Sequence, residues 1–214
     1  MTSSQTIENR HNWQVPAFEV PFWLGREHQN CVIIPVINEG GRIKNLLTLM
    51  AACDVGLAAD ILIVDGGSTD GSLALQTLQE VGVRGVIIKT GAGNLSAQLR
   101  CAYSFALDQG YTGIITIDGN DKDDPAAIHR FIEALAVGVD FVQASRYLVG
   151  GVAVNTPLSR DFAIIFIHAP MLSLFSGFKW TDTTKGFRAY SRKILLDPKV
   201  AIFRNVFKPK ELMA

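Results

Sequence analysis

Short apolar runs alternate with helix-compatible stretches along this chain, and most runs stop at polar or acidic residues. The runs are CVIIPV, ILIVD, GVIIK, GIITID and DFVQASR, at residues 31–36, 61–65, 85–89, 113–118 and 140–146. Continuous runs of this length are typical of strands buried on both faces of a sheet. Because strands alternate with helices, we expect right-handed crossovers and an α/β fold with a mostly parallel central sheet flanked by helices.

Apolar residues between the runs recur at helical spacing. We expect three helices with buried stripes, namely Ile43, Leu46, Leu47 and Met50; Leu95, Leu99, Ala102 and Ala106; and Ile128, Phe131, Ile132 and Leu135. Asn38 is suited to cap the first helix, and Asp124 with Pro125 is suited to begin the third. We interpret residues 1–29 as an irregular N-terminal arm and residues 30–214 as a single domain.

Composition excludes several classes of protein. The chain has 214 residues, of which 48% are hydrophobic, and its formal net charge is zero, so we expect one globular domain that does not bind nucleic acid. The three cysteines, Cys31, Cys53 and Cys101, lie far apart and are odd in number, which indicates reduced thiols in a cytoplasmic protein. The histidines do not cluster with them at zinc-site spacing, and the polar N-terminus lacks the apolar core of a cleavable signal.

Acids and glycines gather where the predicted strands end. In an open parallel sheet ligands bind beyond the carboxyl ends of the strands, so these residues are the candidates for a site. Asp65 ends one run and is followed by GGSTD. A turn explains Asp70, but a carboxylate at the rim of an apolar sheet is costly unless it binds something. We therefore predict a structural role for Asp70, and for Asp65 a contact with a nucleobase N–H or a ribose hydroxyl.

The fourth run ends at Asp118, and Gly119 and Asn120 follow it. Two oxygen-bearing side chains two residues apart can reach one hard cation such as Mg²⁺ or Mn²⁺, and a ligand's phosphates would complete its coordination shell. Gly119 would let the backbone approach that ligand, and Lys122 would add positive charge against phosphate. A solvated acidic turn is the alternative interpretation, and its position at the end of a central strand favours the metal site.

Other motifs are less specific. Gly91-Ala92-Gly93 lacks the spacing of a dinucleotide fingerprint, and there is no P-loop, so a Rossmann dehydrogenase and a P-loop NTPase are both disfavoured. The basic residues of the second half, Arg146, Arg160 and Arg188, are either ion-paired or phosphate-binding. Residues 162–178 predict a helix pair or a helix kinked at Pro170, which is either a core helix or one that lies in a membrane interface.

Taken together, these segments resemble the family 2 glycosyltransferases of the GT-A fold, and in particular the dolichyl- and polyprenyl-phosphate mannose and glucose synthases. The matching segments are VIIPVINEG, VDGGSTDGS, IDGNDKDDPAAI, ASRY followed by VGG, and DTTKGFRAYSRKIL, in order from residue 31 to about residue 207. The resemblance implies an inverting, metal-dependent enzyme that moves a sugar from a UDP- or GDP-sugar to a polyprenyl phosphate or another glycolipid acceptor. It also implies peripheral contact with the inner face of a membrane.

The resemblance assigns roles to individual residues. The nucleotide contacts would be Pro35, Glu39, Asp65, Gly91 and Asp118. Asp118 and Asn120 would bind Mg²⁺ or Mn²⁺ on the donor diphosphate. Arg146 and Arg160 would meet the acceptor phosphate, and Arg146 and Arg188 would assist catalysis. A phosphate acceptor needs little help from a base, whereas a hydroxyl acceptor would need one, for which Asp182 is the candidate.

The chain also departs from the family pattern. Ile37 stands where an aromatic residue is frequent, Gly66 replaces the second acid of V-D-D-G-S, and Asn120 replaces the second acid of D-x-D. The chain ends at KPKELMA, where relatives usually continue, which is consistent with a truncated C-terminus. These departures leave open a catalytically degenerate nucleotide-sugar-binding protein. A second alternative is a sugar-phosphate nucleotidyltransferase, which also places a nucleotide on an α/β sheet, but NEGGRIK is a poor match to its expected basic glycine-rich loop.

Overall fold

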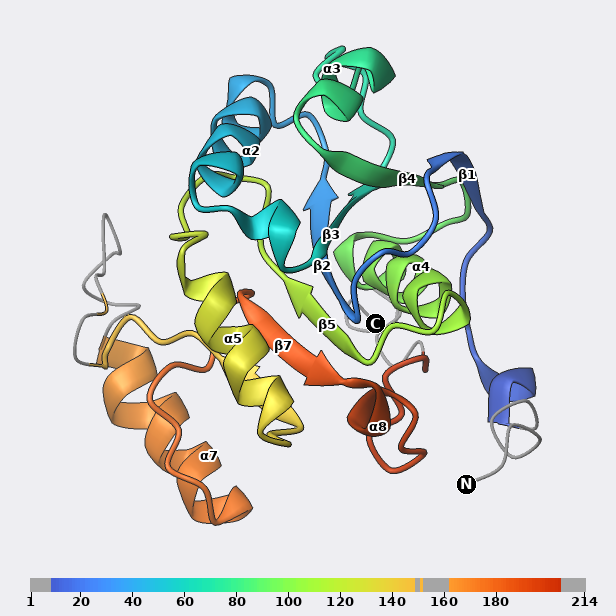
Figure 1. Ribbon diagram of the computed structural model, residues 1–214. Helices are drawn as coiled ribbons and strands as arrows, with labels where there is room; N and C mark the ends of the chain where they lie inside the picture. Colours follow the sequence, from blue (N-terminus) through green and yellow to red (C-terminus); the bar gives the residue numbers. More distant parts are fainter. Residues whose placement is uncertain (1–8, 149–150, 152–161, 205–214) are drawn as a thin grey trace. The chain divides into compact units, whose positions relative to one another are not determined.

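The computed structural model describes residues 9–148, 151 and 162–204 (Figure 1). The chain divides into two compact units. The larger comprises Met1–Val142 and Ala189–Ala214, and the smaller is Gln143–Arg188.

One sheet of seven strands runs in the order β1-β4-β3-β2-β5-β7-β6. The strands are β1 Phe18–Trp23, β2 Asn30–Val36, β3 Asp60–Asp65, β4 Val83–Lys89, β5 Gly113–Thr116, β6 Phe141–Gln143 and β7 Arg188–Ser191. The neighbours β4, β3, β2 and β5 pair in parallel. Every residue of β3 is buried, as the continuous apolar run predicts for a central strand.

Helices cover this sheet. They are α2 Gly41–Ala52, α3 Leu75–Glu80, α4 Leu95–Asp108, α5 Ala127–Ala136 and α8 Arg192–Leu195, with short helical turns η1 Asn9–Asn12 and η2 Val55–Leu57. α4 packs against β2, β3 and β4, and Figure 1 shows α2 on the other side of the sheet. This arrangement follows from right-handed crossovers that run in opposite directions across the sheet.

The predicted buried stripes were right to different degrees. The α2 stripe from Ile43 to Met50 is buried, as expected. The α4 stripe is wrong at its start, because Leu95 is about half exposed and the buried face instead begins at Ala97 and Gln98. α5 begins at Ala127, two residues later than expected, while the Asp124 carboxylate accepts a hydrogen bond from the Ala126 amide.

The N-terminal arm is not irregular throughout. Its segment Phe18–Trp23 forms β1, which pairs antiparallel with β4 at the edge of the sheet. Pro21 lies where the register shifts between Glu19 and Phe22, a position at which a strand tolerates the missing N–H. Trp23 then packs over Gly85, where a Cβ atom would lie only 2.8 Å from the indole ring. Because Pro21 argues against a strand, the sequence pattern did not predict β1, which tertiary packing stabilises.

Strand ends also differ from the prediction. β5 ends at Thr116 and β6 at Gln143, so Asp118 and Arg146 lie in the loops beyond. Cys31, Cys53 and Cys101 are free thiols, as expected.

The smaller unit contains a helical segment near Pro170. A π-helical turn, η3 Ile164–His168, leads directly into α7 Ala169–Ser176, which carries Pro170 in its first turn. The Ala169 amide donates to the Ile164 carbonyl, five residues back, so the turn is wider than an α-helical one. In place of the predicted helix pair or helix kinked at Pro170, the structure has one helical segment in which a π-helical turn precedes α7.

Candidate functional site

Two loops meet at the carboxyl edge of β2 and β3. Val36 of β2 stands opposite Asp65 of β3, and the Gly66 amide donates to the Val36 carbonyl at 2.8 Å. Asp65 is 7% exposed, and its Oδ1 accepts hydrogen bonds from the Gly67 amide (3.0 Å), the Ser68 amide (2.8 Å) and the Ser68 hydroxyl (2.7 Å). One oxygen therefore shapes the loop, while Oδ2 accepts no hydrogen bond from the described residues.

Asn38 links the two loops instead of capping α2, whose N-cap is Gly40. The Asn38 amide donates to the Ser68 hydroxyl at 3.0 Å, and the Asn38 side-chain oxygen accepts from the Thr69 amide at 2.8 Å. Asp70 adds a second link, because its Oδ2 accepts from the Gly40 amide at 2.8 Å. Hydrogen bonds from Ser72, with a smaller contribution from Gly40, hold the pKa of Asp70 below its usual value. Its contacts agree with the structural role predicted for Asp70.

The candidate metal residues follow β5, on the other side of β2 from Asp65. Gly119 lies against the end of β2, where a Cβ atom would be 3.0 Å from the Pro35 carbonyl oxygen and 3.2 Å from Val36 Cγ2. Asn120 Oδ1 is buried and accepts no hydrogen bond from any described residue. A buried acceptor without a partner costs free energy unless a ligand binds it. Asp118 and Asn120 therefore fit an oxygen-ligand site for a divalent cation.

The other predicted nucleotide contacts have structural partners. Pro35 is buried in β2, and Glu39 lies 2.8 Å from Arg42 Nη2 in an ion pair at the start of α2. Gly91 packs against the N-terminal arm, where a Cβ atom would lie 2.7 Å from the Ala17 nitrogen. The Gly91 amide also donates to the Ala17 carbonyl at 2.8 Å. Close approach of the arm is thus sufficient to explain Gly91.

A second group of potential metal ligands lies at the opposite edge of the sheet. It consists of Glu27, His28 and Asp60, whose ligand atoms lie within 4.8 Å of one another, and Asp60 is the first residue of β3. Arg84 Nε lies 3.4 Å from Asp60 Oδ1, and Arg84 also pairs with Glu27. A guanidinium already supplies positive charge there, so this group is not the predicted metal site.

The smaller unit holds a buried ion pair. Asp182 is 2% exposed, and its two oxygens accept from Arg146 Nε (2.8 Å) and Arg146 Nη2 (3.1 Å). The Thr184 amide donates to Asp182 Oδ1 at 3.0 Å, and Arg146 Nη2 also donates to the Thr184 hydroxyl at 2.6 Å. Burial alone would raise the pKa of Asp182, but these hydrogen bonds and the arginine charge outweigh it and lower that pKa. A paired carboxylate of lowered pKa is a weak base, which weighs against the predicted role of Asp182 as a general base.

The other predicted basic residues are less informative. Arg188 Nε donates to the Lys185 carbonyl at 2.8 Å, within the smaller unit. Arg160 lies outside the described residues.

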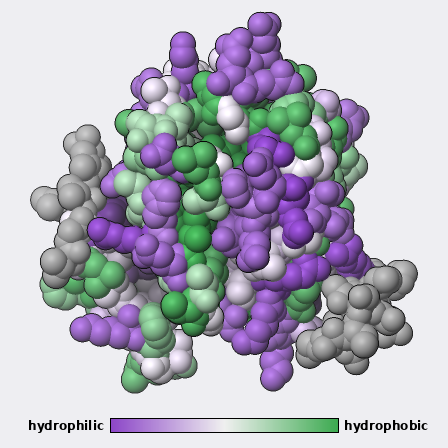
Figure 2. Space-filling view, viewed as in Figure 1, coloured by the Kyte–Doolittle hydropathy of each residue, from purple (hydrophilic) through white to green (hydrophobic). Residues whose placement is uncertain are grey.

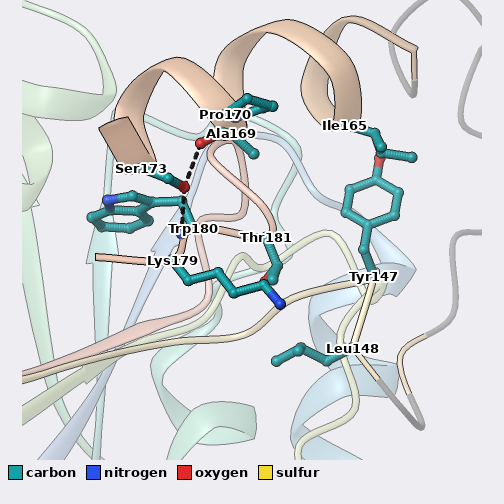
Figure 3. Close-up of a pocket in the computed structure, with 9 residues that line it drawn as sticks. All are labelled: Tyr147, Leu148, Ile165, Ala169, Pro170, Ser173, Lys179, Trp180 and Thr181. Carbon is teal, nitrogen blue, oxygen red and sulfur yellow. Dashed lines mark hydrogen bonds between the residues drawn. The ribbon is translucent and has the colours of Figure 1, made fainter. Parts of the chain in front are cut away.

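A pocket of about 690 Å³ opens beside α7 within the smaller unit (Figure 3). Its lining is mostly apolar or aromatic and consists of Tyr147, Leu148, Ile165, Ala169, Pro170, Ser173, Lys179, Trp180 and Thr181. The Ser173 hydroxyl fixes its wall, donating to the Ala169 carbonyl at 2.6 Å and accepting from the Trp180 amide at 2.9 Å. Lys179 is exposed, and no described residue forms an ion pair or hydrogen bond with its ammonium.

Apolar side chains are also exposed on this helical segment, and Figure 2 shows hydrophobic surface where Figure 1 draws α7. Leu174 and Phe175 are 81% and 80% exposed, and Phe162, Phe166 and Met171 are more than half exposed. Among the described residues, no helix has both the length and the apolar character needed to cross a membrane.

Two residues without a predicted role, Ser68 and Gln98, also hold these loops and strand ends together. Ser68 holds Asp65 and Asn38 together, and Gln98 of α4 reaches the ends of β2 and β3. A polar residue among the apolar positions of α4 was the available signal for Gln98.

A mostly parallel sheet with acid-bearing loops joined at its carboxyl edge defines an open α/β protein whose candidate site lies at that edge. The chain belongs to the Glycosyl transferase family 2, whose family model matches residues 31–197. Solved structures agree with the fold. Glucosyl-3-phosphoglycerate synthase from Mycobacterium tuberculosis, crystallised with Mn²⁺, UDP and glucosyl-3-phosphoglycerate, superposes with a TM-score of 0.56 at 16% identity. That match covers 91% of this chain and 62% of the synthase. The predicted GT-A fold is thereby confirmed.

Curated relatives are more similar in sequence. Polyprenol monophosphomannose synthase of Mycolicibacterium smegmatis is 30% identical over 84% of this chain and 68% of its own length. Undecaprenyl-phosphate mannosyltransferase of Micrococcus luteus is 31% identical over 74% of this chain and 64% of its own length. The chain thus spans about two thirds of the length of these two relatives.

Proposed function

We propose that this protein is an inverting, metal-dependent glycosyltransferase that moves a sugar from a nucleotide-diphosphate donor to a polyprenyl phosphate. The observation that carries the proposal is the carboxyl edge of the sheet. There Asp65 and the segment from Asp118 to Asn120 flank β2, and Asn120 presents a buried acceptor that no described residue satisfies. The relatives named for polyprenol and undecaprenyl phosphate supply the acceptor class.

The donor side follows from the chemistry of the loops. Asp118 and Asn120 would hold Mg²⁺ or Mn²⁺, and the ion, when bound, would offset negative charge on the departing diphosphate. The Mn²⁺ and UDP in the crystal structure of the mycobacterial synthase support this assignment. Asp65 Oδ2 would accept a hydrogen bond from the nucleoside. UDP- and GDP-sugars both satisfy these contacts.

The acceptor side is assigned to the smaller unit. The pocket beside α7 combines a mostly apolar lining with the Lys179 ammonium, which pairs with no described residue. This combination suits a phosphate attached to an isoprenoid chain. Asp182 would act by orienting Arg146, whose guanidinium we expect to meet a phosphate. A phosphate acceptor is already ionised at neutral pH, so the transfer needs no strong base.

The exposed apolar residues of α7 would rest in the interfacial layer of the cytoplasmic face of a membrane. Vesicle flotation tests this contact. Phe175→Ser should reduce binding to vesicles that contain polyprenyl phosphate, whereas Val137→Ser, at an 82% exposed position of α5's C-cap, should not. Equal binding by both variants would remove α7 from the membrane contact.

Transfer itself is tested with a panel of UDP- and GDP-sugars, with and without polyprenyl phosphate, in Mg²⁺, Mn²⁺ or EDTA. We expect a sugar-phosphate-linked lipid product that requires both metal and lipid. Metal-dependent donor binding without product would favour the degenerate nucleotide-sugar-binding protein. Exchange that depends on pyrophosphate would favour the nucleotidyltransferase.

A further inference from the structure

Gly66 and Gln98 share one space in the structure. Gly66 stands where the family segment carries its second acid, and a Cβ atom built on it would lie 3.1 Å from Gln98 Oε1 and 3.3 Å from Gln98 Cδ. The carboxamide of Gln98, which comes from α4, therefore occupies the room that a side chain at position 66 would need. A residue from a different element has taken the place of the missing acid.

Hydrogen bonds fix the orientation of this carboxamide. Its Nε2 donates to the Val36 carbonyl at 2.9 Å and to the Val64 carbonyl. Both partners are acceptors only, so the nitrogen must face them and the oxygen must face Gly66. Gln98 is only 4% exposed, which holds the group in place.

The oxygen is left with unused capacity. No described residue donates a hydrogen bond to Gln98 Oε1, and the atom is not sealed from solvent. It lies beside Gly66, directly after Asp65, at the edge where β2 and β3 end. At Gly67, the next residue along this loop, a Cβ atom would meet nothing within 4 Å.

We propose that Gln98 Oε1 accepts a hydrogen bond from a ring N–H of the donor's nucleobase, N3–H of uracil or N1–H of guanine, and so helps to select the nucleotide. This inference rests on the proposed function. An acceptor requires a donor on the ligand, which excludes the ionised diphosphate and leaves a base N–H or a ribose hydroxyl. Gly67 adds no side chain on this loop that would hinder a flat ring, and the charged Asp65 Oδ2 is the stronger acceptor for a hydroxyl.

The experiment compares four proteins: wild type, Gln98→Ala, Gly66→Asp, and the double variant. Calorimetry measures the affinity of each for UDP and GDP with Mn²⁺, and then for the N3-methyl (uracil) or N1-methyl (guanine) analogue of the nucleotide that binds. We expect Gln98→Ala to weaken binding of the ordinary nucleotide about tenfold, as loss of one hydrogen bond implies. Methylation should weaken wild type strongly and Gln98→Ala hardly at all.

The double variant separates this role from a structural one. Gly66→Asp alone should bind poorly, since its side chain meets Gln98. Removing Gln98 as well frees that space, and the new carboxylate should restore affinity to within about threefold of wild type, a gain that general loosening cannot produce. Thermal denaturation confirms that each variant folds.

Three results would overturn the inference. Gln98→Ala could bind like wild type, or methylation could penalise both proteins equally. The penalty of Gln98→Ala could instead vanish with the 2′-deoxynucleotide, which would assign the contact to ribose. Wild type that binds neither UDP nor GDP would refute the proposed function as well, so the two failures are distinguishable.

Discussion

Removal of Arg146 should destabilise the smaller unit and do so in a pH-dependent way. Arg146→Ala leaves Asp182 buried without its bidentate partner, although the two hydrogen bonds from Thr184 remain. Breaking a buried pair costs about 3–5 kcal/mol. Because the Arg146 side chain is 15% exposed and Thr184 still contributes, we expect a loss of about 2–3 kcal/mol.

The sign of the pH dependence follows from the lowered pKa of Asp182. A carboxyl group with a depressed folded-state pKa contributes stability above its unfolded value of about 4, and this contribution disappears as the pH falls through the folded value. The difference between wild type and Arg146→Ala should therefore be constant from pH 7 to about pH 5 and shrink below about pH 4.

Hydrogen exchange of the Thr184 amide is the local assay, because that amide donates to Asp182 Oδ1. Lys193→Ala is the matched control: Lys193 Nζ pairs with Asp140 at 2.6 Å, but its side chain is 82% exposed. We expect no measurable change from that variant. The reasoning is refuted if Arg146→Ala loses no more protection than the control, or if its loss persists unchanged in acid.

Three further predictions concern the larger unit. Asp118→Asn should abolish Mn²⁺-dependent nucleotide binding, whereas Asn120→Asp should bind Mn²⁺ at least as tightly as wild type. Calorimetry measures both, and unchanged donor affinity in Asp118→Asn would contradict the metal site. Gly91→Ala should lower stability by about 1–3 kcal/mol in chemical denaturation, since the added methyl group meets the backbone of the arm; equal midpoints would show that the arm yields. Tyr111→Phe removes the hydroxyl that donates to the buried Asp60 at 2.6 Å and should cost about 2 kcal/mol of unfolding free energy, whereas a neutral result would mean that the hydrogen bond contributes nothing net.

The central strands were predictable because a strand that is buried on both faces of a sheet has a continuous apolar sequence. β2 and β3 appear at the expected positions for that reason. β1 was missed because its six residues contain a proline and are only partly buried. Its position depends on long-range contacts such as the packing of Trp23 over Gly85, which a local sequence pattern does not reveal.

The candidate site was predictable in part. Parallel pairing brings the ends of β3 and β5 to one edge, so the placement of Asp65 and Asp118 beside β2 could be anticipated from strand order alone. The contacts of individual side chains could not. Asn38 was expected to cap a helix but binds Thr69, which lies 31 residues away in the chain. Such partners depend on how two loops pack, and a single sequence does not specify that.

The two departures from the family pattern have different physical consequences, and both bear on whether the site is still in use. At Gly66 the lost side chain is replaced in space by Gln98, whose nitrogen is satisfied and whose oxygen is not. At Asn120 the amide oxygen is buried with no donor among the described residues. An unsatisfied buried acceptor costs about 1–3 kcal/mol, and an apolar substitution would relieve that cost in a site with no remaining ligand. Gln98 and Asn120 thus each place at this edge of the sheet an oxygen that no described residue satisfies, which agrees with the proposed donor site.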